Sequence, residues 1–117
     1  MSYDLAVWQG DVPPNDREAA RAHERLYEQY LEADELVPAA SSIADFVAAL
    51  TDRWPDRETG DDTPWAATPL IRGASGPYIH IALAWRSADG ASVFVAETAN
   101  ARGLICFDPQ TGSLRTH

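Results

Sequence analysis

Alternating apolar and polar residues predict several β-strands, because successive side chains of a strand point to opposite faces. The clearest stretch is residues 78–85, and residues 3–8 show the same pattern. Shorter strands are expected at residues 68–72, 104–108 and 113–115. Pro69 lacks an N–H group, so it restricts the strand at 68–72 to an edge of the sheet. Residues 73–77 have the length and composition of a hairpin connection into the stretch at 78–85.

Between the first of these strands and the others, the apolar residues recur with helical spacing, which predicts helices there. A helix is expected from Asn15 or Asp16, either of which can cap it, to about Ala33. A second helix is expected from Ser42 to Trp54 and ends at Pro55. Its first residues have the spacing of a capping box, in which Ser42 caps forward and Asp45 reaches back.

Residues 87–103 fit two patterns. A turn at residues 88–90 could lead into a β-branched strand at 93–95. Alternatively, Ser87 caps a helix that ends at Gly103 in a left-handed conformation. The alanine-rich end of the segment favours the helix.

The predicted order is strand, helix, helix, strand, strand, helix, strand and strand. If the two N-terminal helices form one crossover, this is the ferredoxin-like split β-α-β-β-α-β sandwich, with an extra helix after the first strand and a short C-terminal β-extension. We therefore expect a single α+β domain over residues 1–117, with the first and third strands central and parallel. A chain of 117 residues buries roughly 65% of its unfolded surface, which is enough for a core without metals or disulfides.

Charge restricts the partners of the protein. Eighteen acidic residues stand against nine basic ones, all arginine, and the formal net charge is -9. An acidic surface repels phosphate backbones and anionic headgroups, so neither nucleic acid nor a membrane is expected as a direct partner. A basic protein surface, a cation or solubility alone could each explain the charge.

Neither the N-terminus nor the cysteine content indicates export. The first residues lack the charged and apolar regions of a signal peptide, and no run approaches the ~18 apolar residues of a membrane span. The lone Cys106 lies in an apolar run and is expected to be a buried, inert thiol. A cytoplasmic location follows.

Catalytic and cofactor motifs are lacking in the sequence. The histidines, His23, His80 and His117, are far apart, and Cys106 has no evident histidine and acid around it. The glycines at residues 73–76 do not stand between a strand and a helix, as a phosphate loop requires. These absences favour a non-enzymatic protein over an enzyme, and we expect no cofactor and no metal.

An acidic loop at residues 56–64 is the sharpest charged feature. Its candidate partner-binding residues are Asp56, Glu58, Asp61, Asp62 and Trp65. The carboxylates could bind calcium, but their spacing does not match an EF-hand loop. A contact for a basic partner and a simple solvated loop are the other interpretations.

The sheet face opposite the helices is the second candidate. If Ile79, Ile81, Leu83 and Trp85 pack on the helices, then Tyr78, His80, Ala82 and Ala84 point the other way, beside Trp8. Trp8, Tyr78 and His80 would then line a shallow pocket that could receive a ligand or a second copy of the protein. Alternatively, the C-terminal strand or tail covers this face.

Several segments resemble a group of small acidic actinobacterial proteins. They are residues 1–8, 53–56, 64–66, 74–77, Trp85 and 103–110, which together span nearly the whole chain. In that group the segment after Trp85 is more strongly helix-forming, although Gly90 departs from this pattern. The resemblance implies no established activity and no catalytic residues. Some proteins of this size and acidity from such bacteria resemble immunity proteins that neutralise polymorphic toxins.

Two functions follow as expectations. The first is a non-enzymatic protein-binding module, of the immunity type, that engages a basic partner through the acidic loop. The second is a homodimeric ferredoxin-like ligand-binding protein or small enzyme that uses the open sheet face.

Overall fold

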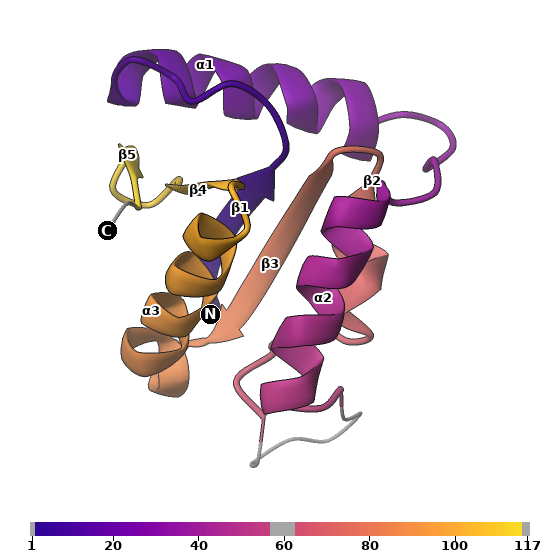
Figure 1. The fold of residues 1–117 in the computed structure, drawn as a ribbon, viewed down its shortest axis with the longest axis vertical. Coiled ribbons are helices and arrows are strands. Elements are labelled where there is room, and N and C mark those ends of the chain that lie inside the picture. Colours follow the sequence, from indigo (N-terminus) through magenta and orange to yellow (C-terminus); the bar gives the residue numbers. More distant parts are fainter. Residues whose placement is uncertain (1, 57–62, 116–117) are drawn as a thin grey trace.

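The computed structural model describes residues 2–56 and 63–115. Within them the chain forms a five-stranded sheet and three α-helices, which confirms the expected α+β class (Figure 1). In chain order the elements are β1 (Ser2–Trp8), α1 (Asp16–Leu26), the π-helical segment η1 (Tyr27–Leu31), α2 (Ser41–Arg53), the 3-10 helix η2 (Leu70–Gly73), β2 (Ala74–Ser75), β3 (Tyr78–Ala84), the 3-10 helix η3 (Trp85–Ser87), α3 (Ala88–Ala101), β4 (Ile105–Asp108) and β5 (Ser113–Leu114). No helix in the described ranges is long and apolar enough to cross a bilayer.

The strands are arranged in the order β2-β3-β1-β4-β5, and each neighbouring pair is antiparallel. β1 and β3 lie side by side inside the sheet, with Ser2 opposite Ala84 and Trp8 opposite Tyr78. The prediction that these two strands run parallel was wrong. A tight hairpin between β2 and β3 reverses the chain immediately before β3 begins, so β3 runs against β1.

The two sides of the central strands are those predicted from the alternation. Ile79, Ile81 and Leu83 are fully buried on the face that packs against α2 and α3. Tyr78 belongs to the opposite face, together with Trp8 of β1. Trp85 was expected to continue the helix-packed side, but β3 ends at Ala84 and Trp85 is 57% exposed in η3.

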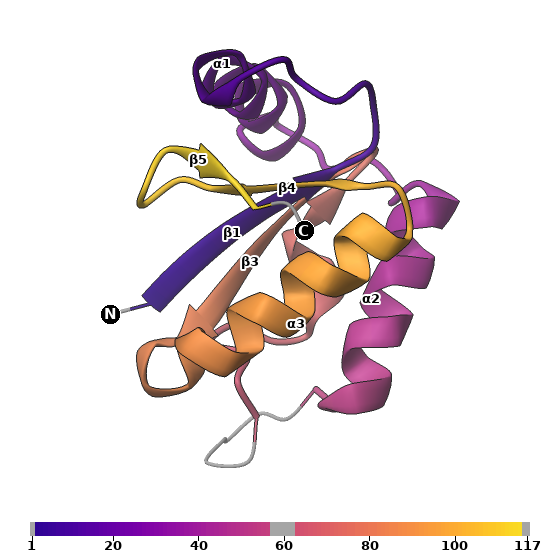
Figure 2. The ribbon, with the colours of Figure 1, turned by 60° about the vertical axis from the view of Figure 1, so that its left-hand side comes forward.

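Helix α1 lies on one face of the sheet, and α2 and α3 lie on the other (Figure 2). The expectation that both N-terminal helices pack on the same side was therefore wrong. The aromatic rings of Trp8, Tyr78 and Phe107 give the second face a large apolar surface, and burying it under α1 removes that surface from water. The C-terminal strand contributes to the same cluster through the partly buried Leu114.

The two N-terminal helices differ in how they begin. Asn15 caps α1 as predicted, because its Oδ1 accepts a hydrogen bond from the N–H of Glu18 at 2.9 Å. The capping box predicted at Ser42 is absent, since α2 begins one residue earlier and the Ser42 hydroxyl donates to the side chain of Gln9. The apolar stripe of α2 is buried as expected, at Ile43, Phe46, Val47 and Leu50.

The predicted edge strand at residues 68–72 is not a strand. The chain pairs with β3 near Trp65, which bridges to Leu83, and it pairs again only in the two residues of β2. Between these points the chain leaves the sheet and forms the 3-10 helix η2. The hairpin loop is consequently Gly76–Pro77 rather than residues 73–77, and Gly76 adopts the left-handed φ of 56° that the tight turn needs.

The segment at 87–103 is helical, which confirms the favoured alternative. Gly90 lies inside the first turn of α3, and Ser87 precedes the helix without a side-chain cap. Gly103 ends it at a φ of 73°. The N–H of Gly103 donates to the carbonyl of Asn100 and the N–H of Leu104 to that of Ala99, which is the Schellman pattern.

A turn after β4 ties the C-terminal part of the chain to β1. The Asp108 carboxylate is buried and accepts hydrogen bonds from the Tyr3 hydroxyl and from the N–H of Gln110. The Gln110 side chain accepts from the N–H of Asp4 and donates to the carbonyl of Ser2. The amide thus extends the pairing of β1 beyond the end of β4.

Candidate functional site

The acidic loop lies only partly within the described residues. Glu58, Asp61 and Asp62 fall outside them. The Asp56 carboxylate accepts a hydrogen bond from the N–H of Leu70 at 2.9 Å, so it holds the start of η2 in place. Trp65 is only 4% exposed, and its indole N–H donates to the carbonyl of Trp54. Both described members of the set therefore have structural roles, and Trp65 is not accessible to a partner.

The predicted open face is divided into two parts. Trp8 and Tyr78 are buried under α1, where their rings stack with centroids 6.3 Å apart. His80 lies at the uncovered part and is half-buried, with its Nε2 atom 3.8 Å from a carboxylate oxygen of Asp4. The three residues chosen from the sequence lie on one face, as predicted, but only His80 reaches the surface.

His23 of α1 joins this face, although sequence reasoning gave it no role. Its Nδ1 atom lies 3.0 Å from the Tyr78 hydroxyl, and its ring contacts the rings of Trp8 and Phe107. Burial lowers the pKa of His23, the charge of His80 lowers this pKa further, and Glu24 opposes the shift. The only sequence signal was the position of His23 at the border of the apolar stripe of the helix.

A groove runs along the exposed side of α1 and η1, next to His23. Its volume is about 430 Å³. We call it the α1 groove, and it is lined by His23, Glu24, Tyr27, Glu28 and Glu32. Tyr27 is 36% exposed, and its ring stands nearly perpendicular to the rings of Tyr78 and His80. The groove therefore combines carboxylates with an accessible aromatic ring.

The glutamates of the α1 groove form no ion pair with the arginines that the structure describes. Glu24, Glu28 and Glu32 follow one another at intervals of four residues. Within the described ranges no arginine forms an ion pair with any of them. Like charges at this spacing destabilise a helix by about 0.2–0.5 kcal/mol per pair. The groove thus brings three carboxylates together at one surface.

The backbone beneath the groove is unusual as well. Residues Tyr27–Leu31 form a π-helical segment, a rare conformation that occurs frequently at functional sites. The acidic character continues in the exposed Asp34 and Glu35, which are followed by the exposed Leu36 and Val37. Exposed apolar side chains that are rimmed by polar ones are a feature of protein-interaction sites.

Metal binding and thiol chemistry are two further possibilities in the described residues. No group of three or more histidine, cysteine, aspartate or glutamate side chains there is arranged to hold a metal ion. Cys106 is buried as predicted, and burial raises the pKa of its thiol to about 12, so the nucleophilic thiolate is not formed near neutral pH.

No family model, no curated protein and no solved structure matches the chain. The geometry of the site itself is therefore what bears on function.

Proposed function

We propose that the protein is a non-enzymatic binding module that engages a basic partner protein through the α1 groove. The observation that carries this proposal is the alignment of Glu24, Glu28 and Glu32 beside the accessible ring of Tyr27, with no arginine of the described chain pairing with them. An arginine or lysine of a partner would gain charge-assisted hydrogen bonds from the carboxylates. It would also gain a cation–π contact with Tyr27.

Solubility alone explains this arrangement less well. Negative charge added for solubility needs no particular position, whereas here three carboxylates share one groove and repel one another. The net charge of -9 would add long-range attraction for a basic partner and accelerate its association.

An immunity-type inhibitor would use such a surface if the toxin that it neutralises is basic. The acidic loop predicted from the sequence remains a second candidate contact. The α1 groove has the better support, since Asp56 and Trp65 of that loop are engaged in contacts within the chain.

The test uses the product of a neighbouring gene, purified in an inactive form, as the binding probe. Glu24→Gln, Glu28→Gln and Glu32→Gln are combined in one variant. Calorimetry should show that this variant binds at least about tenfold more weakly than the wild type, and that the wild-type affinity falls as salt is raised.

A matched control neutralises three exposed acids on the other helices, with Asp45→Asn, Asp89→Asn and Glu97→Gln. The control removes the same net charge and should bind nearly as the wild type does. Equal losses in the two variants would show that only net charge matters, and an affinity indifferent to salt would contradict the proposal.

We further propose that β1, α2, β2, β3, α3 and β4 form a ferredoxin-like unit to which α1 and β5 are added. The antiparallel order β2-β3-β1-β4 supports this, as does the position of α2 and α3 on one face. A homodimeric ligand-binding protein or enzyme built on the opposite face has less support, because Trp8 and Tyr78 lie under α1 and only His80 reaches the surface there.

A further inference from the structure

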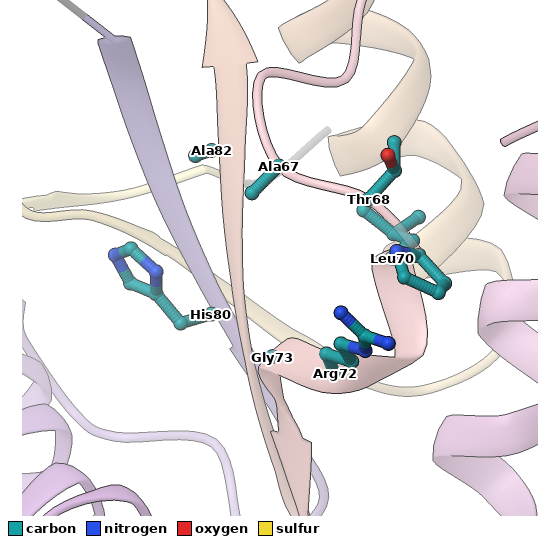
Figure 3. A pocket seen from close by; sticks show the side chains of 8 residues that line it. Ala67, Thr68, Leu70, Arg72, Gly73, His80 and Ala82 are labelled. Carbon is teal, nitrogen blue, oxygen red and sulfur yellow. The ribbon is translucent and has the colours of Figure 1, made fainter. Parts of the chain in front are cut away.

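A hollow lies where the chain leaves the edge of β3. On one side of the gap the N–H of Ala66 donates to the carbonyl of Ala82 at 2.8 Å, and on the other side β2 pairs with the start of β3. The intervening residues 67–73 bow away from the strand and enclose about 240 Å³ (Figure 3). We call this space the β3 hollow.

The strand presents an unused hydrogen-bond donor to the β3 hollow. The N–H and C=O groups of one strand residue point to the same side in an antiparallel ladder. Because the carbonyl of Ala82 faces the loop and bonds to Ala66, the N–H of Ala82 faces the loop as well. This N–H has no acceptor within residues 2–56 and 63–115.

Arg72 supplies a cation to the same space. Its guanidinium extends from η2 toward the gap between the loop and β3, whereas the ring of His80 lies on the other side of the strand (Figure 3). Arg72 forms no ion pair with any residue that the structure describes. Among residues 2–56 and 63–115 no carboxylate belongs to the lining. Ala67, Pro69 and Leu70 make up its apolar part.

We propose that the β3 hollow binds a small organic carboxylate. The guanidinium of Arg72 and the N–H of Ala82 would hold the carboxylate group, and a short apolar body would lie against Ala67, Pro69 and Leu70. A guanidinium and a backbone N–H are favoured partners of a carboxylate. The volume is below the ~300–1,000 Å³ of pockets for drug-sized ligands, so the ligand has few carbon atoms.

This site is independent of the α1 groove and opposite to it in charge. The net charge of -9 disfavours anions at long range, so short-range contacts must select the ligand. Asp56, the carboxylate that adjoins the loop, already accepts a hydrogen bond from the N–H of Leu70. In the part of the lining that the structure describes, Arg72 is therefore the charged group that favours an anion.

The test is a titration of the isotope-labelled protein with propionate and butyrate, followed by the amide NMR signals at constant ionic strength. A saturable shift centred on the Ala82 and Gly73 amides is expected. Arg72→Gln should weaken binding at least about tenfold, as expected for the loss of a charged hydrogen bond. Arg102→Gln, which removes an exposed arginine beyond the end of α3, should leave binding unchanged.

Three results would overturn the proposal. They are no saturable shift at Ala82, equal binding by wild type and the Arg72→Gln variant, and equal binding of chloride or phosphate. A second arm titrates acetyl-alanyl-alanine with a free C-terminus, because a peptide end carries the same carboxylate chemistry. Tighter binding of this peptide than of butyrate would overturn the assignment to a small free acid.

Discussion

The hydroxyl of Tyr78 lies 3.0 Å from Nδ1 of His23 and joins the middle of the molecule to the helix that covers it. Burial raises the pKa of Tyr78, so its hydroxyl keeps its proton. Burial also lowers the pKa of His23, so its ring is neutral near pH 7 and Nδ1 can accept that proton. A hydrogen bond between neutral groups therefore fixes α1 on β3.

This bond predicts a loss of stability in mild acid. A protonated His23 can no longer accept the hydrogen bond of Tyr78 at Nδ1. The unfolded chain also takes up the proton more readily, because its histidine has the ordinary pKa of 6.5. The free energy of unfolding should therefore be highest above about pH 6.5 and should fall as the pH decreases toward the lower pKa of the folded state. Urea titrations of the wild type and of His23→Gln between about pH 8 and about pH 5.5 measure this fall. It should be weaker in the variant.

A direct measurement follows the ring protons of His23 by NMR as the pH is lowered. The midpoint should lie below 6.5 in the wild type. It should rise in His80→Gln, because the charge of His80 is the second cause of the shift. A wild-type midpoint at or above the ordinary value would contradict this account of the bond.

Alanine substitutions at Gly73 and at Gly90 should have opposite effects on the free energy of unfolding. A Cβ atom at Gly73 would lie 2.2 Å from the carbonyl oxygen of His80, where η2 returns to the edge of β3. Gly73→Ala should therefore destabilise the protein by about 2 kcal/mol or more. Gly90 lies in α3 with no atom within 4 Å of the corresponding position, and Gly90→Ala should stabilise by about 0.5 kcal/mol. Denaturant midpoints measure both effects, and a tolerated alanine at residue 73 would show that the loop can move away from β3.

The repulsion in the α1 groove predicts a stabilising substitution. Glu28→Lys replaces two like-charged neighbours with two opposite pairs, to Glu24 and to Glu32. It also replaces the attraction of residue 28 to Arg25 with a repulsion, which offsets part of the gain. The free energy of unfolding should rise by about 0.5–1 kcal/mol at low salt, and the gain should shrink as salt is added. Glu97→Lys is the control, since it changes the net charge equally at an exposed position of α3. Equal gains in the two variants would show that net charge, rather than the groove, is responsible.

Features that depend on a few neighbouring residues could be predicted from the sequence. The alternation in β3 determined which side chains share a face, because strand geometry is local. Asn15 determined the start of α1, and Gly103 determined the end of α3, because each cap involves groups within about one turn. The edge strand at residues 68–72 failed as a prediction because a β-strand needs a partner, and the chain bows away from β3 there.

Burial, by contrast, was decided by the tertiary structure. The sequence by itself determined that α1 is amphipathic. It did not determine which face of the sheet α1 covers. That choice depends on apolar side chains far apart in the chain, including Trp8, Tyr78 and Phe107. The packing of α1 on this face brings His23 to Tyr78 and buries two of the three residues expected to line an open face. It also leaves the glutamates of the α1 groove on the surface.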